Sequence, residues 1–178
     1  MNKLKKLTLP PDRAELAALR AGDRVLLSGS IFTGRDAAHK RLIAALNAGE
    51  KLPIDLDGQT IYYVGPCPAP PGWPVGSAGP TTSYRMDAYA PRLMRECGLV
   101  GMIGKGDRSD AVIDAMRETG AVYFAATGGA AALITKRITA CEVVAYEDLG
   151  PEAIYRMEVE ELAVVVAIDS LGNDLYRR

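Results

Sequence analysis

The side chains best suited to anion binding lie in one short segment, Gly79–Asp87, which reads Gly-Pro-Thr-Thr-Ser-Tyr-Arg-Met-Asp. A helix is predicted to begin at Arg85 and to end before Gly98. The hydroxyl of Ser83 or Thr82 can cap its exposed N–H groups. Helix N-termini carry a positive dipole end, and an arginine binds a carboxylate or phosphate through two parallel hydrogen bonds. The segment is therefore a candidate anion site; the alternative is an ordinary capped helix start whose arginine faces water.

Arg35 and Lys105 add two cations at predicted strand-to-helix junctions. Arg35 follows the predicted strand 24–32, and Lys105 follows the predicted strand 99–103. In open α/β sheets, ligands collect where strands end and helices begin. We therefore expect both cations to lie near segment 79–87 and to bind a small dianion with it. Among small dianions, a dicarboxylate best fits two separate arginines. A phosphate ester is the other candidate, and a solvated lysine is the alternative for Lys105.

His39 and Thr81 are the candidate proton-transfer groups. His39 is the only histidine and lies one helical turn after Arg35, where it acts either as an acid or base or as a packed, orienting side chain. Thr81 can act as a base only if a strongly cationic group lowers the cost of its alkoxide. Three scattered cysteines without a CxxC pair are a weak metal set. We therefore expect no metal ligands here, and any metal that serves Thr81 must belong to another chain.

Composition argues against several other classes of protein. The 21 basic and 22 acidic residues nearly cancel, so no overall charge attracts nucleic acid or an anionic membrane. The longest apolar run, Leu162–Ile168, is too short to cross a bilayer, and no signal-peptide pattern follows the basic start. We expect a cytoplasmic protein with a single domain over residues 1–178 that binds neither nucleic acid nor membrane.

Helices alternate with strands along the chain, which predicts an α/β fold with a mixed sheet flanked by helices. The predicted helices cover residues 12–20, 36–47, 85–97, 109–119 and 130–136, and the predicted strands cover 24–32, 61–64, 99–103, 121–126, 140–146, 153–159 and 162–168. A short acidic turn is expected to join the last two strands as a hairpin, and residues 127–129 are expected to form a tight loop. The proline-rich stretch 65–74 is predicted to be a rigid, ordered loop rather than a disordered linker.

Four motifs together resemble one enzyme family. They are Thr33-Gly34-Arg35-Asp36-Ala37-Ala38-His39-Lys40-Arg41, Gly79-Pro80-Thr81-Thr82 through Arg85-Met86-Asp87, Gly104-Lys105-Gly106, and Asp169-Ser170-Leu171-Gly172-Asn173. In this order, over nearly the whole chain, they resemble the β subunit of the iron-sulfur class of fumarate hydratases. That family includes the β subunit of L-tartrate dehydratase and the C-terminal half of single-chain class I fumarases.

The resemblance implies a swivelling β/β/α domain that pairs with a larger α subunit. A 4Fe-4S cluster would be held by three cysteines of that α subunit and not by this chain. The substrate-binding residues that the resemblance implies are Arg35, Thr82, Arg85 and Lys105. The catalytic residues that it implies are Thr81, which moves the proton at carbon, Lys105, and His39 as a supporting group.

The implied reaction is the reversible hydration of fumarate to L-malate, by a chain that is inert alone. Iron and the cationic side chains would stabilise the aci-carboxylate that forms when the proton leaves carbon. The sequence around residues 31–39 favours fumarate, while Tyr84 beside Arg85 keeps tartrate open as the alternative substrate. A rival of another class is a non-catalytic dicarboxylate-binding module. The expected partners are the α subunit and a small dicarboxylate, in a homodimer or a heterotetramer.

Overall fold

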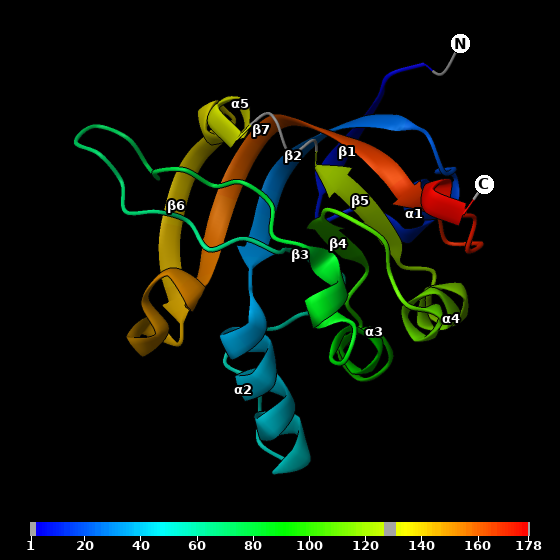
Figure 1. The fold of residues 1–178 in the computed structure, drawn as a ribbon, viewed down its shortest axis with the longest axis horizontal. Coiled ribbons are helices and arrows are strands. Elements are labelled where there is room, and N and C mark those ends of the chain that lie inside the picture. The colour runs from blue at the N-terminus through cyan, green and yellow to red at the C-terminus, as the bar shows by residue number, and fades with distance from the viewer. Residues whose placement is uncertain (1–2, 127–130, 178) are drawn as a thin grey trace.

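The computed structural model describes residues 3–126 and 131–177, and within these residues a seven-stranded mixed sheet curls into a barrel (Figure 1). The strands are β1 (Lys5–Leu9), β2 (Arg24–Thr33), β3 (Thr60–Tyr62), β4 (Gly101–Gly104), β5 (Val122–Ala126), β6 (Ile138–Ala145) and β7 (Ile154–Ile168). They hydrogen-bond in the order β1-β2-β3-β4-β5-β7-β6, and an additional pairing of β2 with β7 closes the ring. Strands β1 to β5 pair in parallel, whereas β7 is antiparallel to β2, β5 and β6. The predicted mixed sheet is therefore confirmed.

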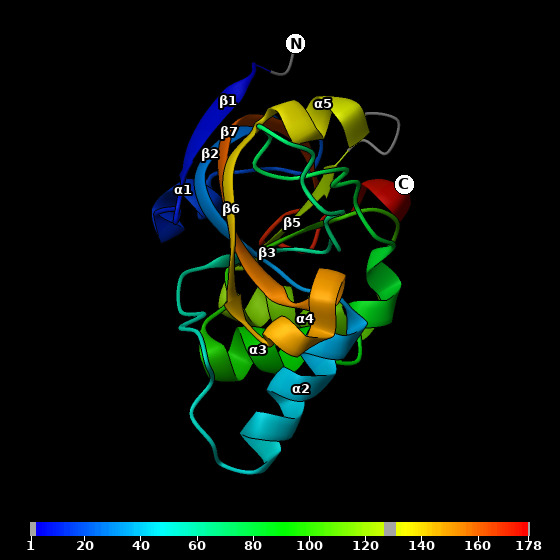
Figure 2. The same ribbon diagram turned by 90° about the vertical axis from the view of Figure 1, so that its left-hand side faces the viewer.

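Helices pack outside this sheet. They are α1 (Arg13–Ala17), α2 (Asp36–Asn47), α3 (Ala90–Cys97), α4 (Asp110–Thr119) and α5 (Ala131–Lys136), with the 3-10 helices η1 (Ser83–Met86), η3 (Glu147–Glu152) and η4 (Leu175–Arg177). Helices α2, α3 and α4 lie together at one end of the molecule, and α5 lies at the other end (Figure 2). The prediction of an α/β fold with a helix-flanked sheet is confirmed.

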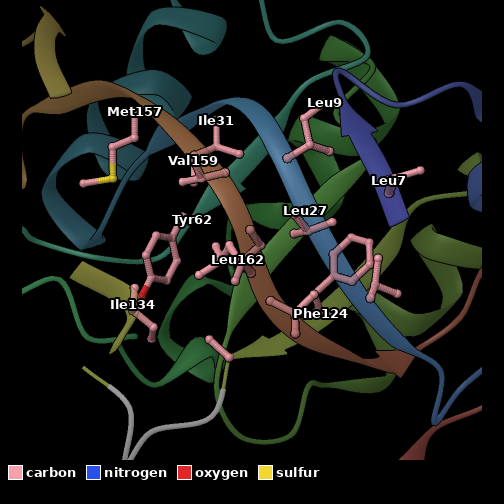
Figure 3. Close-up of a cluster of buried hydrophobic side chains, with 14 of the residues drawn as sticks. Leu7, Leu9, Leu27, Ile31, Tyr62, Phe124, Ile134, Met157, Val159 and Leu162 are labelled. Carbon is pink, nitrogen blue, oxygen red and sulfur yellow. The ribbon is translucent and has the colours of Figure 1, made fainter. Parts of the chain in front are cut away.

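The central strands β3, β4 and β5 are buried on both faces of the sheet. Along β3 and just after it, Tyr62 belongs to one apolar cluster, while Ile61 and Tyr63 belong to a second cluster with α2, α3 and α4. In the first cluster, side chains of β2, β5 and β7 such as Leu27, Phe124 and Leu162 lie together (Figure 3). Strands covered on both faces are apolar at successive positions, which is why these segments are nearly continuous hydrophobic runs in the sequence.

One predicted helix is divided in the structure. Instead of one helix from Arg85, the chain forms η1 and then starts α3 at Ala90. Pro91 explains the division, because it lacks the N–H group that a continuous helix would bond to the Asp87 carbonyl, whereas in the first turn of α3 this group is not needed. The predicted caps are also wrong: Thr82 makes no capping hydrogen bond, and Ser83 bonds to β5 instead.

The predicted C-terminal hairpin is wrong as well, because Ile154–Ile168, which cover nearly all of the two predicted strands, form the single strand β7. The expected acidic turn is a β-bulge: the register with β2 shifts opposite Ser28, and Glu161 adopts a positive φ of 51°. The Ser28 hydroxyl accepts a hydrogen bond from Glu161 N at 2.9 Å, which holds the bulge in place. Of its three antiparallel partners, β6 is the strand that immediately precedes β7 along the chain.

Other boundaries differ less. Strand β1 was not predicted, and α1 ends at Ala17 rather than near Arg20. The helix 36–47 and the strand that begins at Arg24 are confirmed. The tight loop predicted at 127–129 lies outside the described residues. No helix in the described ranges combines the length and apolar character needed to cross a membrane.

Candidate functional site

The carboxyl ends of β2, β3 and β4 form one edge of the barrel, because these strands are parallel neighbours. Arg35 follows β2, Tyr63 follows β3, and Lys105 follows β4. The segment that contains Thr81 and Thr82 crosses the same edge, where Thr81 N donates to the Tyr63 carbonyl at 2.7 Å. The structure therefore places both threonines at the predicted strand-to-helix junctions.

Thr82 and Lys105 are direct backbone neighbours. They form a parallel β-bridge, and Ser83 N donates to the Lys105 carbonyl at 2.9 Å. In return, Lys105 N donates to Ser83 Oγ at 3.1 Å. This close approach requires a glycine at position 104, because a Cβ on Gly104 would overlap Ser83 Oγ. The backbone of Lys105 is thus fixed while its side chain is exposed.

Both arginines are linked to the start of α2, since Arg35 directly precedes this helix and Arg85 pairs with its first residue, Asp36. Arg85 Nη2 lies 3.3 Å from Oδ2 of Asp36, and both side chains are more than a third exposed. Such an ion pair contributes at most about 1 kcal/mol, so the carboxylate of a ligand can replace Asp36. Arg35 packs against Gly65, where a Cβ would come within 2.9 Å of Arg35 Nη1. Its Nε is buried, and in the described part of the chain it has no hydrogen-bond partner.

His39 is fully buried and touches the backbone of Arg35. Its Nδ1 lies 2.8 Å from the Arg35 carbonyl, and because a carbonyl can only accept, Nδ1 carries the proton. The ring lies beside Tyr63 and Tyr89, with centroids 5.5 and 5.9 Å away. Burial lowers the pKa of His39 from 6.5 to about 4; the Arg35 hydrogen bond opposes this shift, and the Arg108 charge adds to it. His39 is therefore neutral at physiological pH and supports the turn that presents Arg35.

Arg108 is an important residue that the sequence analysis missed. It is only 2% exposed, donates from Nε to Asp87 Oδ1 at 2.7 Å, and donates from Nη2 to the Tyr63 hydroxyl at 3.2 Å. Its guanidinium group also lies over the rings of Tyr63 and Tyr123, 5.2 and 4.8 Å from their centroids. The second oxygen of Asp87 accepts from Ser109 N at 2.7 Å. One sequence signal pointed to this ion pair: Asp87 ends the candidate segment, and Arg108 follows Lys105 by three positions.

The Asp169–Asn173 motif lies away from this edge. It borders a hollow of about 810 Å³ that is also lined by α4 and by Arg20 and Arg177. Within the motif, Asp169 accepts hydrogen bonds from the N–H groups of Leu171 and Asn173, as in a tight turn. None of the predicted site residues lines this hollow, so its size does not identify the functional site.

The described residues do not fit an iron-sulfur cluster. Within ranges 3–126 and 131–177, no group of three or more His, Cys, Asp or Glu side chains could hold a metal ion. Cys67 and Cys141 border one groove, whereas Cys97 lies at the end of α3. Thiolate ligands that could surround a cluster are thus not gathered in the described part of the chain.

The whole sequence matches a known family. Residues 2–178 match the family described as Fumarase C-terminus, and the chain belongs to this family. The resemblance inferred from the four motifs is therefore confirmed. The cationic edge of the barrel is accordingly part of a domain found in hydro-lyases.

Three relatives differ in how much of their length this chain covers. The chain is 40% identical over 166 residues to the anaerobic class I fumarate hydratase of Escherichia coli K12. The aligned residues make up 93% of this chain and 30% of that protein. It is 36% identical over 167 residues to fumarate hydratase 2 of Leishmania major, covering 93% of this chain and 29% of the relative. A Methanocaldococcus jannaschii protein provisionally named L(+)-tartrate dehydratase subunit beta is 36% identical over 169 residues, covering 92% of this chain and 87% of its own length. The chain thus spans less than a third of the fumarases but most of the archaeal subunit.

Proposed function

We propose that this chain is the β subunit of a heteromeric hydro-lyase that hydrates fumarate to L-malate. The observation that carries the proposal is the β-bridge between Thr82 and Lys105 at the sheet edge where Arg85 pairs with Asp36, the residue that directly follows Arg35. Three cations and two threonine hydroxyls at one edge suit a small dicarboxylate. The similarity to fumarate hydratases and to a β subunit supports the same assignment.

In this proposal the two arginines bind the two carboxylates of the substrate. Arg85 exchanges its exposed partner Asp36 for one carboxylate, and Arg35 uses the Nε that has no partner among the described residues. Each arginine recognises a carboxylate through parallel N–H donors, so both the distance between the carboxylates and their orientation are selected. Thr82 adds a hydroxyl donor beside them, and His39 keeps the backbone of Arg35 in place.

Thr81 and Lys105 act at carbon. In the dehydration direction the Thr81 alkoxide removes the C–H proton, and the electron pair moves into the adjacent carboxylate to give an aci-carboxylate. The electron pair then returns to form the C=C bond while the hydroxide on the neighbouring carbon leaves, and this hydroxide takes the proton back from Thr81 to give water. Lys105 stabilises the added negative charge, because its backbone is held at this edge next to Thr82 and its ammonium group is free to turn toward the substrate. The cationic surroundings also lower the cost of a Thr81 alkoxide. The 4Fe-4S cluster is assigned to a partner α subunit, since the described residues of this chain do not fit one.

L-Tartrate dehydration is the second candidate activity. One observation favours it: the relative that this chain covers to 87% is named for tartrate dehydratase. Tyr84, which is 61% exposed next to Arg85, is placed where it can change the shape of the substrate pocket. Both reactions use the same cations, because both substrates are four-carbon dicarboxylates.

The test is anaerobic coexpression with the cluster-bearing partner, followed by assays of fumarate hydration and L-tartrate dehydration. We expect activity in the complex only, with neither chain active alone, and the preferred substrate identifies the enzyme. Sizing of the complex separates a heterotetramer from a homodimer. Fumarate binding by this chain alone, without activity in any mixture, would instead support a non-catalytic binding module.

An arginine substitution makes the test specific to the site. Arg85→Ala should lower kcat/KM by a factor equivalent to about 2–5 kcal/mol, because a desolvated carboxylate loses its cation. Arg92→Ala is the matched control, since Arg92 is an exposed arginine that pairs with Glu96 on α3. Unimpaired turnover of the Arg85→Ala complex would contradict the assignment.

A further inference from the structure

Two buried hydroxyl groups hold the backbone on either side of Lys105. Lys105 N donates to Ser83 Oγ at 3.1 Å, Ser83 Oγ lies 2.8 Å from the Tyr123 hydroxyl, and Tyr123 donates to the Gly106 carbonyl at 2.8 Å. A carbonyl can only accept, so the single proton of Tyr123 is used on Gly106. The Ser83 proton therefore goes to Tyr123, and each donor in this chain of hydroxyls has one acceptor.

The chain of hydroxyls connects three separate parts of the fold. Ser83 is the first residue of η1, Tyr123 lies on β5, and Gly106 lies in the loop after β4. Ser83 also donates its own N–H group to the Lys105 carbonyl at 2.9 Å. Both backbone polar groups of Lys105 and the next carbonyl are thus fixed, whereas the ammonium group extends into solvent.

The buried ion pair behind Tyr123 supports this arrangement. The Tyr123 ring lies 4.8 Å from the Arg108 guanidinium, which is paired with Asp87 at 2.7 Å. Asp87 follows Ser83 by four residues, so the same ion pair fixes the segment to which Ser83 belongs. Burial raises the pKa of Tyr123, which keeps its hydroxyl protonated and able to donate.

We propose that Ser83 and Tyr123 are positioning residues that set the location of Lys105 relative to Thr81 and Thr82. Both side chains are fully buried, so they act through the backbone and do not touch substrate. This inference rests on the proposed hydratase function of the same edge. A displacement of about 1 Å in a catalytic group can cost about 100-fold in rate, and loss of either hydroxyl frees the loop to move.

The test compares Tyr123→Phe, Ser83→Ala and the double variant in complex with the cluster-bearing partner. Tyr123→Phe keeps the ring that packs on Arg108 and removes only the hydroxyl. We expect each single variant to lower kcat/KM by about 10- to 100-fold, with a raised KM for the dicarboxylate. The double variant should lose no more than the single variants, because all three interrupt one chain of hydrogen bonds. A variant that merely unfolds more easily would lower apparent kcat without changing KM.

Ser28→Ala is the matched control. The Ser28 hydroxyl likewise accepts a hydrogen bond from a distant backbone amide, that of Glu161, but it lies at the β2–β7 bulge rather than at the candidate site. We expect this variant to keep the kcat/KM and KM of the unchanged protein. An equal rise in KM in Ser28→Ala would overturn the positioning role, as would additive losses in the double variant.

Amide hydrogen exchange of this chain alone gives a readout that does not depend on activity. Exchange of the Lys105 amide should be about tenfold faster in Ser83→Ala and Tyr123→Phe and unchanged in Ser28→Ala. Unchanged exchange at Lys105 in the first two variants would overturn the inference. If the complex of the protein without substitutions had no hydratase activity, the proposed function would be refuted instead. The exchange rates of the Lys105 amide would still decide whether the two hydroxyls hold Lys105.

Discussion

Burial, rather than a charged neighbour, sets the protonation state of His39. The pKa of this side chain is about 4 in the folded protein and 6.5 in an unfolded chain, so the unfolded chain takes up a proton first as the pH falls. The stabilisation is complete above pH 6.5 and is lost progressively toward pH 4. Between pH 7.5 and pH 5 the expected loss is about 2 kcal/mol in the free energy of unfolding.

Urea unfolding of the unchanged protein and of His39→Gln at the two pH values measures this loss. The unchanged protein should lose about 2 kcal/mol more than the variant, because the variant has no imidazole to protonate. Carboxylates such as Asp169, whose pKa is lowered in the fold, titrate in both proteins and cancel in the comparison. Parallel losses in the two proteins would show that His39 is not buried in a neutral form.

Site residues differed in how visible they were in the sequence. Arg35 and Lys105 could be selected because each follows an apolar strand by one or two residues and stands beside glycine. Arg108 was marked only by its position three residues after Lys105, because its partners Asp87 and Tyr63 are 21 and 45 residues away along the chain. The role of Ser83 was misassigned for the same reason: local geometry allowed a cap, while a distant tyrosine on β5 provided the actual partner.

The helices and strands that could be predicted are those whose local signals agree. Helix α2 has the predicted bounds, since a periodic apolar pattern lies between a strand end and Gly49. Strand β7 could not be predicted as one element, because Glu160 and Glu161 look like a turn until the bulge opposite Ser28 is known. Strand β1 is short and basic, and it is recognisable only from its parallel pairing with β2. The pattern of neighbouring residues thus predicts most of the helices and strands. The exceptions, β1 and β7, depend on pairing with strands that are distant along the chain.

The ion pair that joins the η1–α3 segment to the start of α4 should dominate the stability of this region. Asp87→Asn leaves the fully buried Arg108 side chain without its counter-charge, and we expect a loss of about 3–5 kcal/mol in the free energy of unfolding. Replacing both partners by apolar residues, as in Asp87→Leu with Arg108→Met, should recover much of that loss. Chemical denaturation of the unchanged protein, of Asp87→Asn and of the double variant measures the three free energies of unfolding.

An exposed pair provides the control for this prediction. Arg92 and Glu96 form an ion pair on the surface of α3, and Glu96→Ala should cost less than about 1 kcal/mol. If Asp87→Asn costs no more than Glu96→Ala, the buried pair does not hold the two segments together. The support proposed for Ser83 and Tyr123 would then have to come from the hydroxyls alone.

At the scale of the whole molecule, the closed sheet was beyond the reach of the sequence. Strand alternation predicted parallel pairing, but closure depends on the pairing of β2 with β7, for example Leu27 with Leu162. Strand β7 pairs with β2, β5 and β6, so it joins β2 to β5 in the closed ring and carries β6 at its edge. The same unit accounts for 30% of one relative and 87% of another, which is consistent with a domain that occurs within longer chains and as a separate subunit.

Closure predicts that β2, β5 and β7 lose stability together. Leu27 is fully buried on β2, and Leu27→Ala should lower the free energy of unfolding by about 2–5 kcal/mol. Native-state hydrogen exchange should show the same decrease for amides of all three strands, because opening any one pairing breaks the ring. Leu171→Ala, at a position that is 58% exposed, should change stability by less than about 0.5 kcal/mol. A decrease confined to the β2–β7 pairing would mean that the sheet opens there while β3, β4 and β5 stay folded, and the cationic edge would then be stable without closure of the barrel.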